Sequence, residues 1–376
     1  MIDFSGRDRA ARGGDRDGLQ FRAVDAGGAV GTLVLPPLDQ RRGAAVVVLG
    51  GSRGGLDDHD AIAFAKAGFM ALALAYFGVG ELPPALVEVP LEYVRRAIEW
   101  LRRQPELADR RVGVVGRSKG GELALLLAAT SPPDISAVVG YTPSPIIWQG
   151  LPADRRGWRK GPRSSWSVDG NPVPFLPFAQ PRARDMPGFV VSVLAQKVAL
   201  QPVYERALVD PEARERATTP LEQIAGPVLL ISGTGDQLGP APTLCELAMS
   251  RLAGHQHPFP DQHLSYDGAG HLIGPPGCPA TKPGRFAEAG ARLWTPRPVR
   301  TPGRESSNSS NATFRPGRVA SLPQRGPTKR SSSETMIESR DPHLTLRGDR
   351  HPGAGRRLLA RTAQPVPRHD PRVPSR

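Results

Sequence analysis

A glycine-flanked serine motif is the part of this sequence best suited to chemistry. Residues 116–120 read Gly-Arg-Ser-Lys-Gly, with Ser118 at the centre. The apolar run 112–115 precedes the motif, and the segment 120–130, rich in Leu and Ala, follows it. A strand that turns sharply into a helix lifts a serine hydroxyl clear of the sheet, and only small residues fit beside so tight a turn. The sequence therefore predicts a nucleophilic serine at position 118.

A nucleophilic serine needs a base, and the base needs an acid to orient it. After a turn of this kind the acid and then the histidine follow along the chain. Asp236 comes directly after an expected strand, 228–232. His271 ends a glycine-rich loop just after the last expected strand. We predict that Ser118, Asp236 and His271 form a catalytic triad.

The other acids and histidines of this region have simpler interpretations. Asp261 and Asp267 are alternatives for the acid, but we interpret both as turn residues. His263 begins an expected strand, which favours a structural role. His255 and His257 lie in a polar loop, so we expect them at the solvated surface.

An oxyanion formed during attack by serine needs two backbone N–H donors. One donor is expected from Lys119, the residue after the serine. The other is expected from Gly51 and Ser52 in the glycine-rich loop 50–55, where glycines let the backbone approach a substrate closely. A phosphate-binding loop is the competing interpretation, but the glycine spacing matches neither common phosphate-loop pattern.

Strands and helices alternate around these residues, which predicts a mostly parallel sheet with helices on both faces. A hairpin of two strands is expected over 19–36. The alternation of strands and helices is interrupted at 148–181, which we interpret as an insertion over the site. The expected later strands cover 44–49, 70–75, 112–115, 137–141, 228–232 and 263–266. The expected helices cover 57–67, 89–103, 120–130 and 243–251, with part of 202–224. The predicted fold class is an α/β fold.

The positive charge of the chain gathers at one end. The net charge of the chain is +13. Residues 283–376 hold 19 Lys and Arg against 7 Asp and Glu, so this segment alone contributes +12. This segment is rich in Pro, Arg and Ser and lacks apolar periodicity, so we expect a disordered tail. Residues 1–18 are expected to be flexible, and 19–282 form the predicted domain. Nucleic acid could bind only at the tail, which lacks regularly interleaved aromatic residues, so we do not expect it as a partner.

The remaining composition argues for a cytoplasmic protein without a metal or cofactor. Its two cysteines, Cys245 and Cys278, have no metal-ligand spacing and suit a reducing compartment. The first 18 residues lack the apolar core of a secretion signal. No stretch approaches the roughly 20 apolar residues of a membrane span.

Several longer strings resemble one family. Ser-Lys-Gly-Gly-Glu at 118–122, Ala-Leu-Ala-Tyr-Phe-Gly at 73–78 and the strings around Asp236 and His271 resemble the catalytic α/β-hydrolase domain of the acyl-CoA thioesterase / bile acid-CoA:amino acid N-acyltransferase family. The resemblance runs from about residue 43 to 276. It implies the same triad and a coenzyme A thioester as the substrate.

Two departures from the family pattern bear on this resemblance. About forty residues precede the expected hydrolase domain, so we expect the β-sandwich domain of the animal members to be absent. We also find no family-like helix after residue 276, and we hypothesise that the tail is an out-of-frame reading of the natural end.

The resemblance favours a serine hydrolase of acyl thioesters, because an acyl-serine lacks the preference for amines that an acyl-cysteine has. Arg53, Arg155, Arg156 and Lys160 could contact the phosphates of coenzyme A, although we favour a solvated basic loop as the interpretation at each position. The alternatives are an ester, lactone or peptide hydrolase, an acyl-CoA:amino acid N-acyltransferase, or an inactive chain whose basic tail binds nucleic acid.

Overall fold

The computed structural model describes residues 18–26, 29–108, 111–180, 199–275 and 298–299. All of them fall within Met1–Ser307. The segment predicted to be flexible, 1–18, lies outside these ranges except for residue 18. The predicted tail, 283–376, lies outside them except for Pro298 and Val299, which pair with the last strand of the predicted domain.

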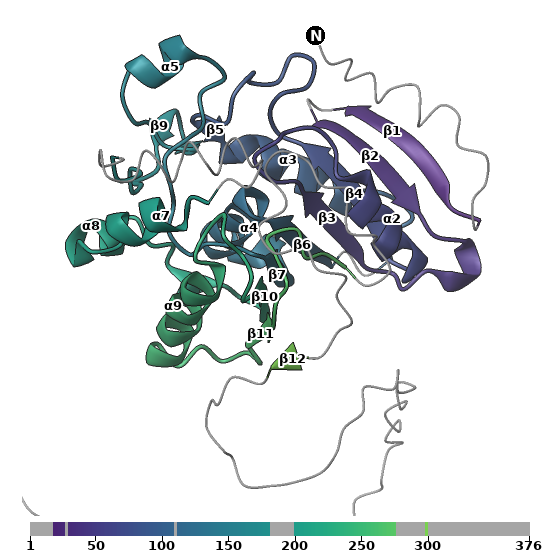
Figure 1. Cartoon of the computed structure of the whole chain (residues 1–376). Coiled ribbons are helices and arrows are strands. Elements are labelled where there is room, and N and C mark those ends of the chain that lie inside the picture. The colour runs from purple at the N-terminus through teal and green to yellow at the C-terminus, as the bar shows by residue number, and fades with distance from the viewer. Residues whose placement is uncertain (1–17, 27–28, 109–110, 181–198, 276–297, 300–376) are drawn as a thin grey trace, which may run out of the picture. The chain divides into compact units, whose positions relative to one another are not determined.

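One nine-stranded sheet forms the centre of the fold (Figure 1), with the order β1-β2-β4-β3-β6-β7-β10-β11-β12. Its strands from β4 to β11 run parallel, and the two edges, β1-β2 and β12, are antiparallel. The strands are β1 (Gln20–Ala26), β2 (Ala29–Leu35), β3 (Ala45–Leu49), β4 (Met70–Ala75), β6 (Val112–Arg117), β7 (Ala137–Tyr141), β10 (Val228–Gly233), β11 (Gln262–Tyr266) and β12 (Pro298–Val299).

Helices cover the two faces of this sheet, as the alternation of the sequence predicts. The main helices are α2 (Asp58–Lys66), α3 (Leu91–Arg102), α4 (Lys119–Thr130) and α9 (Ala241–Gly254). The core on one face joins α3, α4 and α9 to alternate strand residues such as Val47 and Leu72. On the other face Ala61 and Ala65 of α2 pack against neighbours such as Val48. Strands β3 and β4 are buried along their whole length, which explains their continuous apolar runs.

The predicted insertion has more regular structure than its sequence suggests. It contains the short helix α5 (Arg155–Arg159) and the strands β8 (Trp166–Val168) and β9 (Asn171–Pro172). These strands form a second, three-stranded sheet with β5 (Val89–Pro90). The chain continues through α7 (Gln201–Ala207) and α8 (Pro211–Arg216) before it re-enters the main sheet at β10.

Three turns of 3-10 helix complete the described elements: η1 (Leu38–Gln40), η2 (Pro132–Asp134) and η4 (Leu221–Gln223). No helix in the described ranges has the length and apolar character needed to cross a membrane.

Candidate active site

Ser118 occupies a strained turn between β6 and α4. Its backbone has φ 53° and ψ −116°, in the positive-φ region that residues with a side chain rarely adopt. The backbone N–H of Ser118 donates to the carbonyl of Tyr141 at 2.8 Å, which ties the turn to the end of β7. Such strain, held by surrounding structure, is concentrated at functional sites.

The two glycines of the motif have no room for a side chain. A Cβ built on Gly116 would lie 2.0 Å from the carbonyl oxygen of Gly120, and one on Gly120 would lie 2.2 Å from the carbonyl oxygen of Leu49. Helix α4 therefore packs closely against β6 and β3, and its first turn begins immediately after Ser118. This packing is the physical reason for the spacing read from the sequence.

Asp236 and His271 are brought together by the loops after β10 and β11. His271 Nδ1 and Asp236 Oδ2 are 2.7 Å apart, and the aspartate side chain has no solvent exposure. Asp236 Oδ1 accepts the backbone N–H groups of Leu238 at 2.9 Å and Gly239 at 3.2 Å, which fix the carboxylate. His271 Nε2 is buried and has no hydrogen-bond partner among the described residues. The ring is oriented, and one nitrogen is left to accept a proton.

A second aspartate–histidine pair lies nearby in the sequence, but its geometry differs. His257 Nδ1 is 2.6 Å from Asp261 Oδ2, while His257 Nε2 is 2.7 Å from the carbonyl oxygen of Ile224. Both ring nitrogens of this histidine are therefore engaged within the fold, and neither is left open toward a reacting group. The expectation that His257 lies at the solvated surface is wrong, since its side chain is only 1% exposed. The loop residues 255–261 fold back onto η4, a contact that sequence alone does not reveal.

The other residues considered as alternatives have structural contacts. Asp261 Oδ1 also accepts the backbone N–H of Val228 at 3.0 Å. Thr234 Oγ1 donates to Asp267 Oδ1 at 2.9 Å in the loop between β10 and Asp236. His263 lies in β11 with its Nε2 2.8 Å from Ser232 Oγ, and burial lowers the pKa of its imidazole. Asp236 is therefore the aspartate that pairs with His271, whereas Asp261 pairs with His257 and Asp267 with Thr234.

The three residues expected to supply the oxyanion donors have different surroundings. The N–H of Lys119 is at the first position of α4, where the helix offers it no acceptor. Gly51 lies against the serine, because a Cβ built on it would be 3.6 Å from Ser118 Cβ. Ser52 is the next residue and is exposed. Tyr76 supports the loop by donating its hydroxyl to the carbonyl of Gly50 at 2.5 Å.

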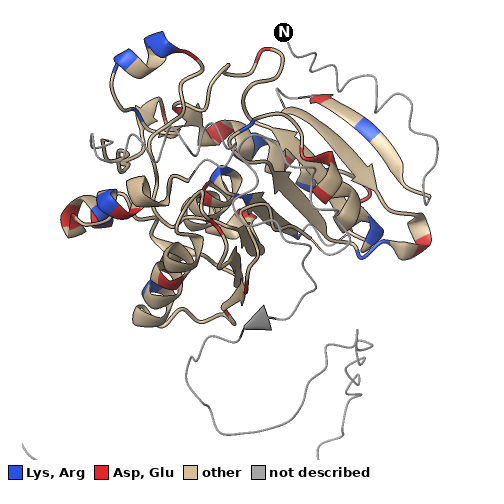
Figure 2. Ribbon diagram, viewed as in Figure 1, with Lys and Arg blue, Asp and Glu red and all other residues tan. Residues whose placement is uncertain are grey.

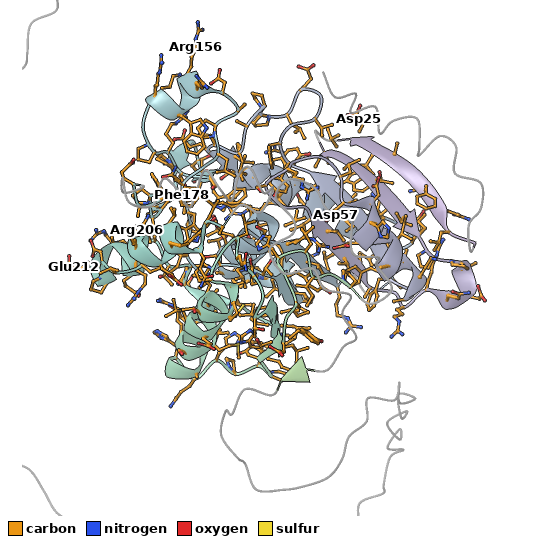
Figure 3. The ribbon with its side chains drawn as sticks, in the orientation of Figure 1. Asp25, Asp57, Arg156, Phe178, Arg206 and Glu212 are labelled. Atoms are coloured by element: carbon orange, nitrogen blue, oxygen red, sulfur yellow. The ribbon has the colours of Figure 1, made fainter. Side chains whose placement is uncertain are left out.

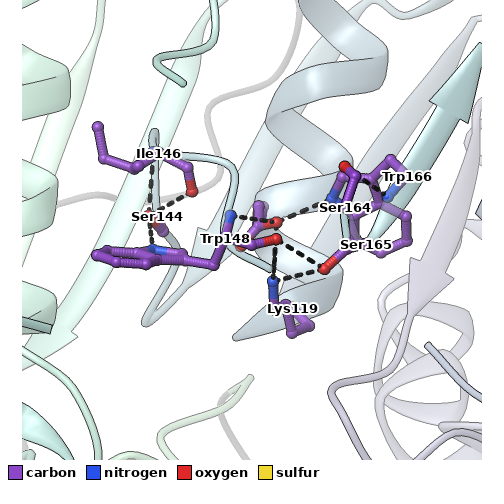
Figure 4. A network of polar contacts seen from close by, with 8 residues as sticks. Lys119, Ser144, Ile146, Trp148, Ser164, Ser165 and Trp166 are labelled. Carbon is purple, nitrogen blue, oxygen red and sulfur yellow. Dashed lines mark hydrogen bonds and ion pairs between the residues drawn. The ribbon is translucent and has the colours of Figure 1, made fainter. Parts of the chain in front are cut away.

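The side chain of Lys119 anchors the insertion to the first turn of α4 (Figure 4). Its Nζ is 3.0 Å from Glu122 Oε1, and it donates to Ser165 Oγ at 2.8 Å and to the Trp148 carbonyl at 3.2 Å. Trp166 Nε1 donates to the same Glu122 oxygen at 2.9 Å. Burial lowers the pKa of Lys119 and raises that of Glu122. Trp148, Ser165 and Trp166 of the insertion therefore contact the first turn of α4, next to the serine turn.

The basic residues of the insertion gather on α5 (Figure 2). The exposed side chains are Arg155, Arg156, Arg159 and Lys160. Arg156 extends outward at the tip of this helix (Figure 3). Arg53 is likewise exposed, in the loop that holds Gly51.

Two residues near the site were not anticipated from the sequence. Thr142 also has a positive φ, 45°, and its hydroxyl lies 3.2 Å from the carbonyl oxygen of His271. Arg117 ends β6 with a side chain that is only 14% exposed. A charge at the end of a buried strand needs partners, so Arg117 could have been noticed from sequence; Thr142 has no such signal.

Comparison with known proteins places the chain in a family. Residues 89–294 match the family described as "BAAT / Acyl-CoA thioester hydrolase C terminal", a match that extends past the predicted domain end at 282. Mouse acyl-coenzyme A thioesterase 6 is 30% identical over 268 residues, covering 70% of this chain and 56% of that protein. Mouse acyl-coenzyme A amino acid N-acyltransferase 1 is 29% identical over 267 residues, with coverage of 70% and 56%. The chain thus spans little more than half the length of these relatives.

Solved structures of similar fold are α/β hydrolases and esterases. The Pf2001 esterase of Pyrococcus furiosus is 15% identical, with a TM-score of 0.42 and coverage of 72% of this chain and 89% of that one. A dienelactone hydrolase from Anabaena variabilis is 19% identical, with a TM-score of 0.38 and coverage of 69% and 91%. The described sheet is mostly parallel, and the chain belongs to the BAAT / acyl-CoA thioester hydrolase C-terminal family.

Proposed function

We propose that this protein hydrolyses acyl thioesters of coenzyme A, with Ser118 as the nucleophile, His271 as the base and Asp236 as the acid that orients it. The observation that carries the proposal is the open Nε2 of His271, buried and without a partner among the described residues while Nδ1 is held by Asp236. An unpaired buried acceptor costs about 1–3 kcal/mol. A catalytic base has a reason to be kept in this state, because its nitrogen must be available to take the proton of the serine hydroxyl during attack.

In the proposed reaction His271 Nε2 takes the proton of Ser118 Oγ as the oxygen bonds to the thioester carbonyl carbon. The N–H groups of Lys119 and Gly51 stabilise the negative oxygen of the tetrahedral intermediate. The carbon–sulfur bond then breaks, and His271 returns its proton to the departing thiolate. Water, deprotonated by His271, hydrolyses the acyl-serine and regenerates the enzyme. Serine in place of cysteine favours water as the acceptor, because an acyl oxyester does not share the preference of a thioester for amines.

The proposal is tested by measuring thiol release from a panel of acyl-CoA substrates of increasing chain length. Ser118→Ala is expected to lower kcat by a factor on the order of 10⁶, the typical loss for a triad nucleophile. Ser131→Ala, a buried serine at the other end of α4, is the control and should retain activity. Thioester hydrolysis that survives in Ser118→Ala would refute the assignment of the nucleophile.

A second candidate activity is transfer of the acyl group to an amino acid, which the name of one relative supports. The two activities differ in their product, so mass spectrometry of reactions with added amino acids separates them. Free fatty acid alone supports hydrolysis, whereas accumulation of an N-acyl amino acid supports transfer. Side-by-side rates on acyl-CoA and p-nitrophenyl esters test the ester-hydrolase alternative in the same way.

A further inference from the structure

We propose that Arg117 is a positioning residue for His271, and that its guanidinium holds together the three loops that form the active site. The inference rests on the proposed function, because it assigns a task within the Ser118–Asp236–His271 triad. Arg117 is the variable residue directly before the serine, and the general motif requires no charge at that place.

One side of the guanidinium holds the chain just after His271. Arg117 Nη1 donates to the carbonyl of Ile273 at 2.6 Å and to that of Leu272 at 3.3 Å. The chain then passes so close that a Cβ on Gly274 would lie 2.9 Å from Nη2. The residues that follow the histidine are therefore fixed to the last residue of β6 rather than only to their own strand.

The other side of the guanidinium faces two carboxylates at the start of α2. Arg117 Nη2 forms an ion pair with Asp60, which is buried, and Nε lies 3.8 Å from Asp57 Oδ2. Burial and the neighbouring Asp60 raise the pKa of Asp57. Asp57, labelled in Figure 3, is half-buried, and a Cβ built on Gly50 would lie 3.8 Å from the Cβ of Asp57. This side of the arginine is thus connected to the loop that carries Gly51.

The flat face of the guanidinium contacts the third part of the site. Arg117 Cζ lies 5.7 Å from the centre of the Tyr141 ring, and the carbonyl of Tyr141 accepts the N–H of Ser118. A lysine could supply the charge but not this combination, because only a planar group with several donors can stack on a ring and bind acceptors on both sides. We therefore expect the shape of the arginine, and not only its charge, to set the position of His271.

The test compares Arg117→Met with Arg251→Met as a matched control. Arg251 of α9 is similarly covered, 19% exposed against 14%, and is paired with Glu215 of α8 and Glu222 of η4. A misplacement of a catalytic group by about 1 Å costs on the order of 100-fold in rate. For Arg117→Met we expect kcat to fall by about that factor with KM within about threefold of the wild type. For Arg251→Met we expect kcat per folded molecule to be unchanged.

The same variants are examined for their reaction at Ser118. A fluorophosphonate reagent should label Ser118 more slowly in Arg117→Met, because labelling also needs the base. Millimolar guanidinium should restore part of the activity of Arg117→Ala, and Arg117→Lys should lie between the wild type and Arg117→Met. Wild-type kcat and labelling rates in folded Arg117→Met, or an equal loss in Arg251→Met, would overturn the proposal. If Arg117→Met does not fold, Arg117→Lys carries the test, and a normal kcat in that variant would overturn it.

Failure of the proposed function gives a different result from failure of this inference. A wild type that is labelled at Ser118 and cleaves p-nitrophenyl esters, but leaves acyl-CoA intact, removes the thioester proposal. The effect of Arg117 is then measured on the ester and still stands. If the reagent does not label Ser118 in the wild type, both the proposed triad and this inference are refuted.

Discussion

Replacing Asp236 by asparagine changes the charge and the donor pattern of the triad without changing its shape. In the native site one carboxylate oxygen accepts two backbone N–H groups, from Leu238 and Gly239, and the other faces His271 Nδ1. Asparagine has only one oxygen for these two tasks. Turning that oxygen toward His271 would point the NH2 group at two other donors and lose two hydrogen bonds of about 1 kcal/mol each.

We therefore expect the asparagine oxygen to stay with the backbone, with its NH2 group donating to His271 Nδ1. The imidazole must then carry its proton on Nε2, the nitrogen that should accept the proton of Ser118. In a serine protease the equivalent change of tautomer lowers kcat by about 10⁴. At about 1.36 kcal/mol per factor of ten, this is an increase of roughly 5.4 kcal/mol in the activation free energy. We expect a loss of this size for Asp236→Asn.

The second aspartate–histidine pair supplies a matched control for this prediction. Asp261 also holds a histidine Nδ1 with one oxygen and a backbone N–H with the other. Asp261→Asn makes the same chemical change and should reduce stability while leaving kcat of the folded protein unchanged. Both variants are assayed by thiol release under saturating substrate, with thermal unfolding followed by circular dichroism. A kcat within tenfold of the wild type for folded Asp236→Asn would refute the reasoning.

Two further predictions concern stability, measured by urea unfolding. Lys119→Met leaves Glu122 buried without its cation, so we expect the free energy of unfolding to fall by about 3–5 kcal/mol. The double variant Lys119→Met/Glu122→Leu should recover much of this loss. A loss below about 1 kcal/mol in the single variant would contradict the prediction. Burial lowers the pKa of His263, so its contribution to stability is fully present above the unfolded pKa of about 6.5 and is lost as pH falls through the folded value. The wild type should therefore lose more stability between pH 7 and pH 5 than His263→Gln does, and equal pH dependence in the two proteins would refute the assignment.

The sequence predicts the central sheet well because its strands carry the signal in their own residues. The run 44–49 is rich in valine and is buried on both sides in β3, which is the pattern of an interior parallel strand. The helix expected over 89–103 forms as α3 over Leu91–Arg102, since its apolar positions recur at helical spacing. The small sheet is missed because β5 and β9 have only two residues each. Such short strands have no period to detect.

The contacts that complete the site depend on residues far apart in the chain. Arg117 and Asp60 are 57 positions apart, and His257 reaches a carbonyl 33 positions away. Neither contact belongs to a local pattern, so sequence gives only the requirement that a buried charge find a partner. The pairing of Asp236 with His271 is accessible from sequence because a parallel sheet brings the ends of its strands to one edge, whereas the role of Ser118 stays a prediction.

Several unfavourable features of this protein occur at or next to the serine turn. Ser118 has a positive φ, His271 Nε2 is buried without a partner among the described residues, and Arg117 and Lys119 hold largely or fully buried charges on either side of the serine. Backbone strain of this kind costs about 1–3 kcal/mol, and an unpaired buried acceptor costs a similar amount. A site under no functional demand would be expected to lose such features, because most replacements there would relieve strain. The positive φ of Ser118, with an ion pair on each side of the serine, argues that the turn is held in shape for reaction and that its stability comes from the packed sheet behind it.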